Sequence, residues 1–154
     1  MTTQSQTFKP SPRSLIGALW LFAILNYIYC DVLALHDPVY AAEILTGDIG
    51  GIEMNQGFIL GASVLMTIPM SATLVIRIAP RALARWWSAI AGIIMTLVQI
   101  TSLNVGSGPT MSYVYFSVIE IATTATIAWL SISKLRTESV PAAVPASTPV
   151  TVNA

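Results

Sequence analysis

Residues 14–33 read SLIGALWLFAILNYIYCDVL, a run of twenty residues with no lysine or arginine and one acidic residue, Asp31, near its end. A bilayer core of about 30 Å is crossed by roughly 20 mostly apolar residues in helical form. Strands are shorter, about 4–8 residues, so a buried strand does not account for a run of this length. The stretch therefore predicts a helix that crosses a membrane.

Three further stretches of the chain have the same character, at residues 56–79, 86–105 and 112–133. Ser11 before Pro12 suits the start of the first helix, and Pro80 separates the second from the third. Pro69 lies within the second stretch, where neighbouring helices tolerate the kink that it causes. We predict an all-α protein, a four-transmembrane-helix bundle with both termini on one side.

The composition supports a membrane protein. Charged residues make up 9% of the 154 residues and hydrophobic residues 55%, whereas soluble domains have about 25% charged residues. The partner that we expect is the lipid bilayer. The formal net charge of zero argues against a nucleic-acid partner, because such partners are bound by neutralising phosphates.

The basic residues indicate the orientation. Residues 31–55 carry five acidic residues and no basic one, and all seven basic residues flank the opposite ends of the four stretches: Lys9, Arg13, Arg77, Arg81, Arg85, Lys134 and Arg136. The positive-inside rule then places both termini in the cytoplasm of a multi-pass protein of the plasma membrane. Arg77, Arg81 and Arg85 are expected to set the topology, with lipid head groups as a second role.

Three regions follow from these assignments. Residues 1–13 are expected to be a cytoplasmic N-terminal segment, residues 14–135 the four-helix membrane domain, and residues 136–154 a disordered cytoplasmic tail rich in proline, alanine, valine, threonine and serine. Residues 34–45 are mildly amphipathic and predict a short helix on the outer surface. Residues 46–51, which contain three glycines, predict a flexible turn.

Glu120 is the strongest pointer to function, because it lies inside the fourth stretch. A carboxyl at that depth costs several kcal/mol unless it is paired, hydrated or protonated. Ser117 and Thr124 share its helix face. Asn26, Ser63 and Gln99 lie at similar depths in the other three stretches, so these residues could form one polar layer, with Asp31 near its outer mouth.

Two interpretations of this layer stay open. It could hold a small molecule, an ion or a proton in an outward-facing pocket around Glu120. Alternatively, it could fix the packing of a structural or interaction subunit, although interhelical hydrogen bonds in membranes average only about 0.6 kcal/mol. Gly57 and Gly61 form a small-residue face through which a homo- or hetero-oligomer could assemble.

An enzyme is less favoured by the sequence. We find no serine–histidine–aspartate set, no paired catalytic carboxylates and no cluster of metal ligands, so we expect neither a metal nor a cofactor. The single cysteine, Cys30, suits a small buried residue better than a nucleophile. The single histidine, His36, is expected in a solvated loop.

Several motifs together resemble a family of small bacterial four-span membrane proteins of unknown function. The resemblance covers about residues 14–135, and the motifs that carry it are Leu19-Trp20-Leu21-Phe22, Leu25-Asn26-Tyr27-Ile28-Tyr29, Asp31-Val32-Leu33, Asp37-Pro38, Glu43-Ile44-Leu45-Thr46-Gly47, Gly50-Gly51, Gln56-Gly57-Phe58, Ile68-Pro69-Met70 and Ile119-Glu120-Ile121. Cys30 departs from the family, in which a small residue such as alanine is expected.

The size and the number of spans are also similar to those of DoxX-like four-helix membrane proteins. That likeness implies a redox component as a third alternative. It is a likeness of architecture, which does not by itself supply a function.

Overall fold

The computed structural model describes residues 10–104 and 109–137. Four long helices dominate the described chain: α1 (Pro12–Ala34), α3 (Gln56–Ile78), α4 (Arg81–Ser102) and α5 (Met111–Thr137). Each of them contains a segment long and apolar enough to cross a membrane. The predicted all-α bundle of four transmembrane helices is confirmed, and the chain is a multi-pass membrane protein.

The helix starts follow from local chemistry. The Ser11 side chain accepts a hydrogen bond from the Ser14 amide at 3.2 Å, and Pro12 occupies the first turn. The Asn55 side chain caps α3 by accepting from the Phe58 amide at 2.9 Å. Pro80 precedes α4, which begins at Arg81 and so includes residues 81–85, N-terminal to the expected span.

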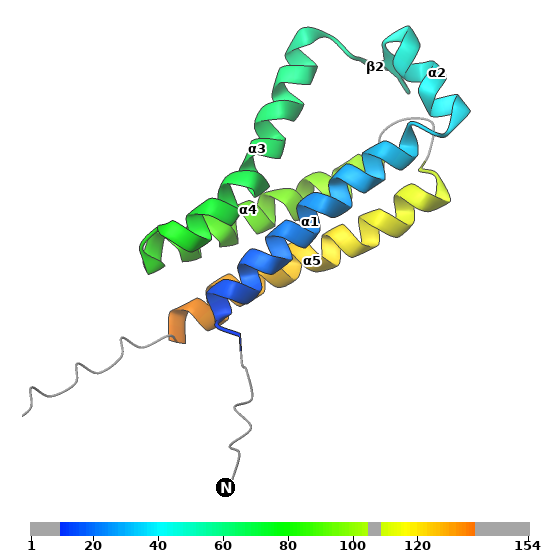
Figure 1. Ribbon diagram of the computed structural model, residues 1–154. Helices are drawn as coiled ribbons and strands as arrows, with labels where there is room; N and C mark the ends of the chain where they lie inside the picture. The colour runs from blue at the N-terminus through cyan, green and yellow to red at the C-terminus, as the bar shows by residue number, and fades with distance from the viewer. Residues whose placement is uncertain (1–9, 105–108, 138–154) are drawn as a thin grey trace, which may run out of the picture.

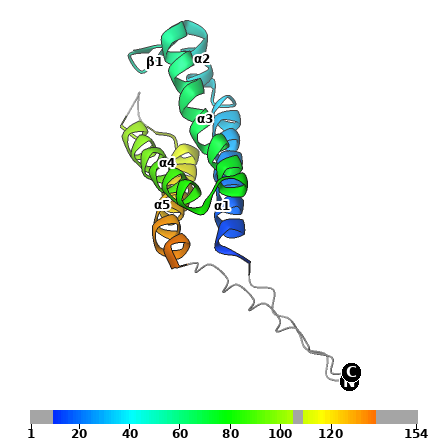
Figure 2. The same ribbon diagram turned by 90° about the vertical axis from the view of Figure 1, so that its left-hand side faces the viewer.

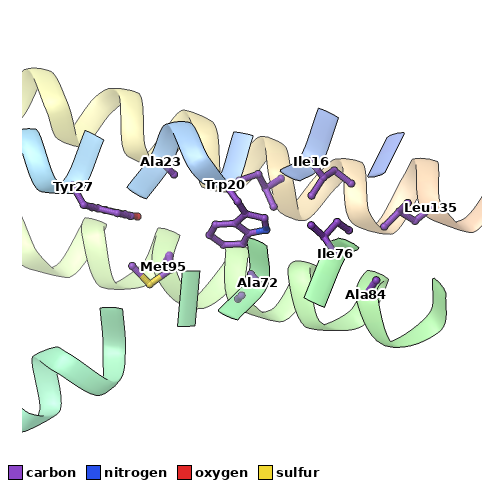
Figure 3. Packing of buried hydrophobic residues seen from close by; sticks show 11 residues of the cluster. Ile16, Trp20, Ala23, Tyr27, Ala72, Ile76, Ala84, Met95 and Leu135 are labelled. Carbon is purple, nitrogen blue, oxygen red and sulfur yellow. The ribbon is translucent and has the colours of Figure 1, made fainter. Parts of the chain in front are cut away.

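The core of the bundle lies between α1, α3, α4 and α5 (Figures 1 and 2). Trp20 of α1 is fully buried at its centre, and its indole N–H donates to the Ser88 hydroxyl of α4 at 3.3 Å. Figure 3 shows Trp20 with other buried hydrophobic residues of the same core, which include Ile16, Ala23, Tyr27, Ala72, Ile76, Ala84, Met95 and Leu135. A buried indole satisfied in this way fixes α1 against α4.

Helix α3 joins the bundle only with its second half. Pro69, Ala72 and Ile76 are buried, whereas residues 56–64 are exposed. Figure 1 shows that α3 bends near its middle and that its first half leaves the other helices. Pro69 lies inside the helix, where its missing N–H and its ring weaken one turn.

A short helix and a hairpin connect α1 to α3 and cover one end of the bundle (Figure 1). Helix α2 (Pro38–Thr46) is capped by Asp37, and strands β1 (Asp48–Ile49) and β2 (Ile52–Glu53) pair antiparallel. The two-residue turn consists of Gly50 and Gly51, with φ of 57° and 88°. Two successive positive φ values suit glycine. Where the sequence predicted a flexible turn, the structure has a regular hairpin.

The ends of the bundle differ in charge. We define the basic end as the end at which α1 and α4 begin and α3 and α5 finish (Figure 1); Arg13, Arg77, Arg81, Arg85 and Lys134 lie there in the chain. The acidic end carries α2 and the hairpin, with Asp31, Asp37, Glu43, Asp48 and Glu53. Lys9 and the tail after residue 137 lie outside the described residues.

Candidate functional site

Polar side chains meet along the contact between α4 and α5. The Gln99 amide N–H donates to the Ser117 hydroxyl at 2.8 Å, and the hydroxyls of Thr96 and Thr124 lie 2.8 Å apart. Nearer the acidic end, the Tyr113 hydroxyl donates to the Ser102 hydroxyl at 2.7 Å. We call this set the polar seam; it comprises Thr96, Gln99 and Ser102 of α4 and Tyr113, Ser117, Glu120 and Thr124 of α5.

The spacing along α5 explains the seam. Residues 113, 117, 120 and 124 recur at intervals of four, three and four, which places them on one helix face. Gly92 of α4 lets the two backbones approach closely: a Cβ atom there would lie 2.9 Å from the Thr124 carbonyl oxygen and 3.1 Å from the Ala128 Cβ.

Glu120 is buried within the seam. Its side chain is 1% exposed, and its Oε1 atom has no hydrogen-bond partner among the described residues. The Glu120 backbone carbonyl accepts from the Thr124 hydroxyl at 2.8 Å, so this contact does not satisfy the carboxyl. An ionised carboxyl in such a place is costly, and a proton, a water molecule or a bound donor group would lower that cost.

Two buried polar atoms of α1 also have no hydrogen-bond partner among the described residues. Asn26 is 9% exposed and Tyr27 is 6% exposed, and the Asn26 Oδ1 and Tyr27 Oη atoms have no hydrogen-bond partner among the described residues. Negative charge on Glu120 acts unfavourably on Tyr27 and Cys30 of α1, and negative charge on Asp31 acts unfavourably on Glu120. The candidate site therefore involves α1 as well as the seam.

Residues of the predicted polar layer are buried on three of the four long helices. Gln99 and Ser117 are hydrogen-bonded to each other, and Asn26 and Glu120 are buried. Ser63 does not join them: it is exposed, and its hydroxyl donates to the Ile59 carbonyl of its own helix at 2.8 Å. The reason is the bend of α3, which carries the half that contains Ser63 away from the bundle.

A cavity of about 310 Å³ lies at the acidic end. Asp31, which the sequence places near the outer mouth of the polar layer, lines this cavity, whereas the deeper Glu120 does not. The lining residues come from α1, α2, the hairpin, α3, α4 and α5: Cys30, Asp31, Ala34, Asp37, Tyr40, Glu43, Ile49, Ile52, Phe58, Ser102, Pro109, Thr110, Ser112 and Tyr113. Sequence reasoning missed most of them, because the cavity is assembled by packing of the connecting segment.

Tyr40 of α2 is close to Asp31 in this cavity. Burial, followed by the negative charge of Asp31, raises the pKa of the Tyr40 hydroxyl above its ordinary value. Cys30, the next residue along α1, is 6% exposed and also lines the cavity. The connecting segment therefore contributes Tyr40 to the same cavity that Asp31 lines.

The remaining predicted residues lie elsewhere. The Arg85 guanidinium lies 5.0 Å from the centre of the Trp86 ring at the basic end, where Arg77 and Arg81 also lie. A Cβ atom at Gly61 would meet nothing within 4 Å, and Gly57 is exposed on the same half of α3. No other helix in the described chain covers this small-residue face.

Comparison with known proteins gives a family. The family described as "Family of unknown function (DUF6326)" matches residues 6–140. The chain belongs to this family. No curated protein matches the chain, and no solved structure matches it either. The membership accords with the resemblance to small membrane proteins of unknown function, whereas the expected likeness to DoxX-like proteins is not shown.

Proposed function

We propose that this membrane protein binds a small molecule in the cavity at its acidic end, with the polar seam and Glu120 beneath the bound molecule. The observation that carries the proposal is the cavity of about 310 Å³ with Asp31 in its wall. Ligand pockets measure roughly 300–1,000 Å³ and combine apolar walls with a few polar groups. This cavity has both features, since Ile49, Ile52 and Phe58 lie opposite the carboxylate-bearing end of α1.

Tyr113 and Ser102 connect the cavity to the seam. Both residues line the cavity, and their hydroxyls are hydrogen-bonded to each other. Glu120 follows Tyr113 by seven residues on α5, which is about 10 Å along a helix. A molecule in the cavity would therefore rest on the top of the seam, and a proton on Glu120 would respond to its charge.

The orientation that we propose puts the acidic end outside the cell. The basic end would then face the cytoplasm of the plasma membrane, with Arg77, Arg81 and Arg85 near anionic head groups. The cavity would open outward, toward solutes of the surroundings.

The proposal can be tested at Cys30, the only cysteine of the chain. The small neutral reagent methyl methanethiosulfonate should modify Cys30 of the full-length protein in lipid nanodiscs, as measured by mass spectrometry. Ala34→Trp fills the cavity and should slow this reaction by about tenfold or more, because a large side chain displaces the free volume.

The matched control is Leu45→Trp, at a residue of α2 that is 88% exposed and does not line the cavity. This variant should react at the wild-type rate. Equal rates in all three proteins, or no reaction in any of them, would contradict a solute-accessible cavity.

A second candidate function is that of an interaction subunit. It is favoured by the uncovered half of α3 that carries Gly57 and Gly61. A second membrane helix could approach this small-residue face closely. Gly61→Cys in a Cys30→Ser background should then form a disulfide-linked species in membranes, and a protein that stays monomeric under oxidation would count against this candidate.

A further inference from the structure

Aromatic residues of three elements line the cavity. Tyr40 of α2, Phe58 of α3 and Tyr113 of α5 all line it. Tyr40 and Phe58 lie in the chain between the end of α1 and the bend of α3. Tyr113 is the residue of the polar seam nearest the start of α5.

The charge in this cavity has one sign. Asp31, Asp37 and Glu43 line it, and none of its described lining residues is a lysine or an arginine. Asp37 uses its carboxylate to cap α2, accepting from the Val39 amide at 2.9 Å. Asp31 and Glu43 both act electrostatically on Tyr40, and the effect of Asp31 is the larger of the two.

This combination favours one class of cation. Aromatic faces attract quaternary ammonium groups through their negative quadrupole, and a carboxylate adds the opposite charge. Alkylammonium groups carry apolar methyls that suit the walls formed by Ala34, Ile49 and Ile52. An anion would be repelled by Asp31, and a neutral apolar molecule would leave that carboxylate without a counter-charge.

We propose that the cavity binds an alkylammonium group, with Asp31 as the counter-charge and Tyr40, Phe58 and Tyr113 as the aromatic walls. This inference rests on the proposed function, in which the cavity is the binding site, and it names the chemical class of the ligand. It assigns no role to Glu120, which lies deeper in the bundle.

Protection of Cys30 tests this assignment. The full-length protein in nanodiscs is treated with methyl methanethiosulfonate in the presence of tetramethylammonium chloride, and the rate is compared with that in sodium chloride at equal ionic strength. Tetramethylammonium should slow the modification of Cys30 in a saturable manner. tert-Butanol, a neutral molecule of similar shape, should give no such protection.

Variants separate charge from aromatic contact. Asp31→Asn should raise the concentration of tetramethylammonium needed for half-protection by about tenfold, because the counter-charge is lost. Tyr40→Leu should raise it severalfold, and Tyr40→Phe, which keeps the ring, should restore protection. Each rate is referred to that of the same variant without tetramethylammonium.

The failure of this inference differs from the failure of the proposed function. A Cys30 that reacts but is not protected by tetramethylammonium, or is protected equally well in Asp31→Asn, overturns the alkylammonium assignment alone. A Cys30 that does not react at all overturns both, because the cavity is then closed to small solutes.

Discussion

Glu120 is the buried carboxyl of the polar seam, and its substitution separates a structural role from a functional one. Its Oε1 atom has no partner among the described residues, so replacement by an apolar side chain removes a buried polar group without breaking a side-chain hydrogen bond. Glu120→Leu should therefore unfold at the wild-type temperature or above it. The measurement is thermal unfolding in detergent, followed by tryptophan fluorescence.

Gln99→Leu is the control for this prediction. It breaks the hydrogen bond from the Gln99 amide to the Ser117 hydroxyl, and it should cost about 0.6–1.7 kcal/mol, the range measured for interhelical bonds in membranes. If Glu120→Leu lowers stability as much as Gln99→Leu does, Glu120 is part of the packing and its burial gives no pointer to function.

The polar residues of the spans show what a sequence can and cannot predict at this scale. Glu120, Gln99 and Ser117 share a depth that follows from counting residues along helices, and they are buried together. Ser63 has a similar depth but is exposed, because depth along a helix fixes neither the face on which a residue lies nor where the helix bends. The cavity at Asp31 depends on segments far apart in the sequence, so local pattern does not reveal it.

The contact between α4 and α5 rests on a glycine that spacing rules do not single out. The sequence draws attention to Gly57 and Gly61, which have the familiar small-residue spacing, yet Gly61 faces open space. Gly92 makes the close approach, with the Thr124 carbonyl 2.9 Å from the position that a Cβ atom would take. A single glycine opposite Thr124 and Ala128 has no pattern of its own, and only the packing identifies it.

A matched pair of variants tests this contact between the helices. Gly92→Ala should destabilise the bundle by about 1–3 kcal/mol, because the added methyl overpacks a backbone contact. Gly61→Ala, at a position with no atom within 4 Å, should not lower stability. Thermal unfolding of both variants in one detergent makes the comparison, and equal stability of the two would contradict the close α4–α5 contact.

The helices themselves are the part of the fold that follows most directly from the sequence. Apolar length, Pro12, Pro69 and Pro80 account for the four long helices and for the bend in α3. The hairpin at residues 48–53 is less evident, because each strand has two residues. Its two positive-φ glycines are compatible with a flexible turn as well as with a regular one.

At the scale of the whole molecule, the separation of charge is the feature that relates the fold to the membrane. Apart from the buried Glu120, the basic and acidic residues lie at opposite ends of the described bundle. A bilayer that surrounds the helices would therefore have the arginines at one surface, and α2, the hairpin and the cavity at the other. The proposed function requires that the second surface be outside.

The most direct test of this account is the sidedness of two exposed positions in intact cells. Leu45 of α2 is 88% exposed at the acidic end, and Ile78 is 81% exposed at the basic end. Each is changed to cysteine in a Cys30→Ser background and treated with a membrane-impermeant maleimide. We expect Leu45→Cys to be labelled in intact cells and Ile78→Cys only after lysis; labelling of Ile78→Cys in intact cells, with Leu45→Cys protected, would show that the acidic end faces the cytoplasm.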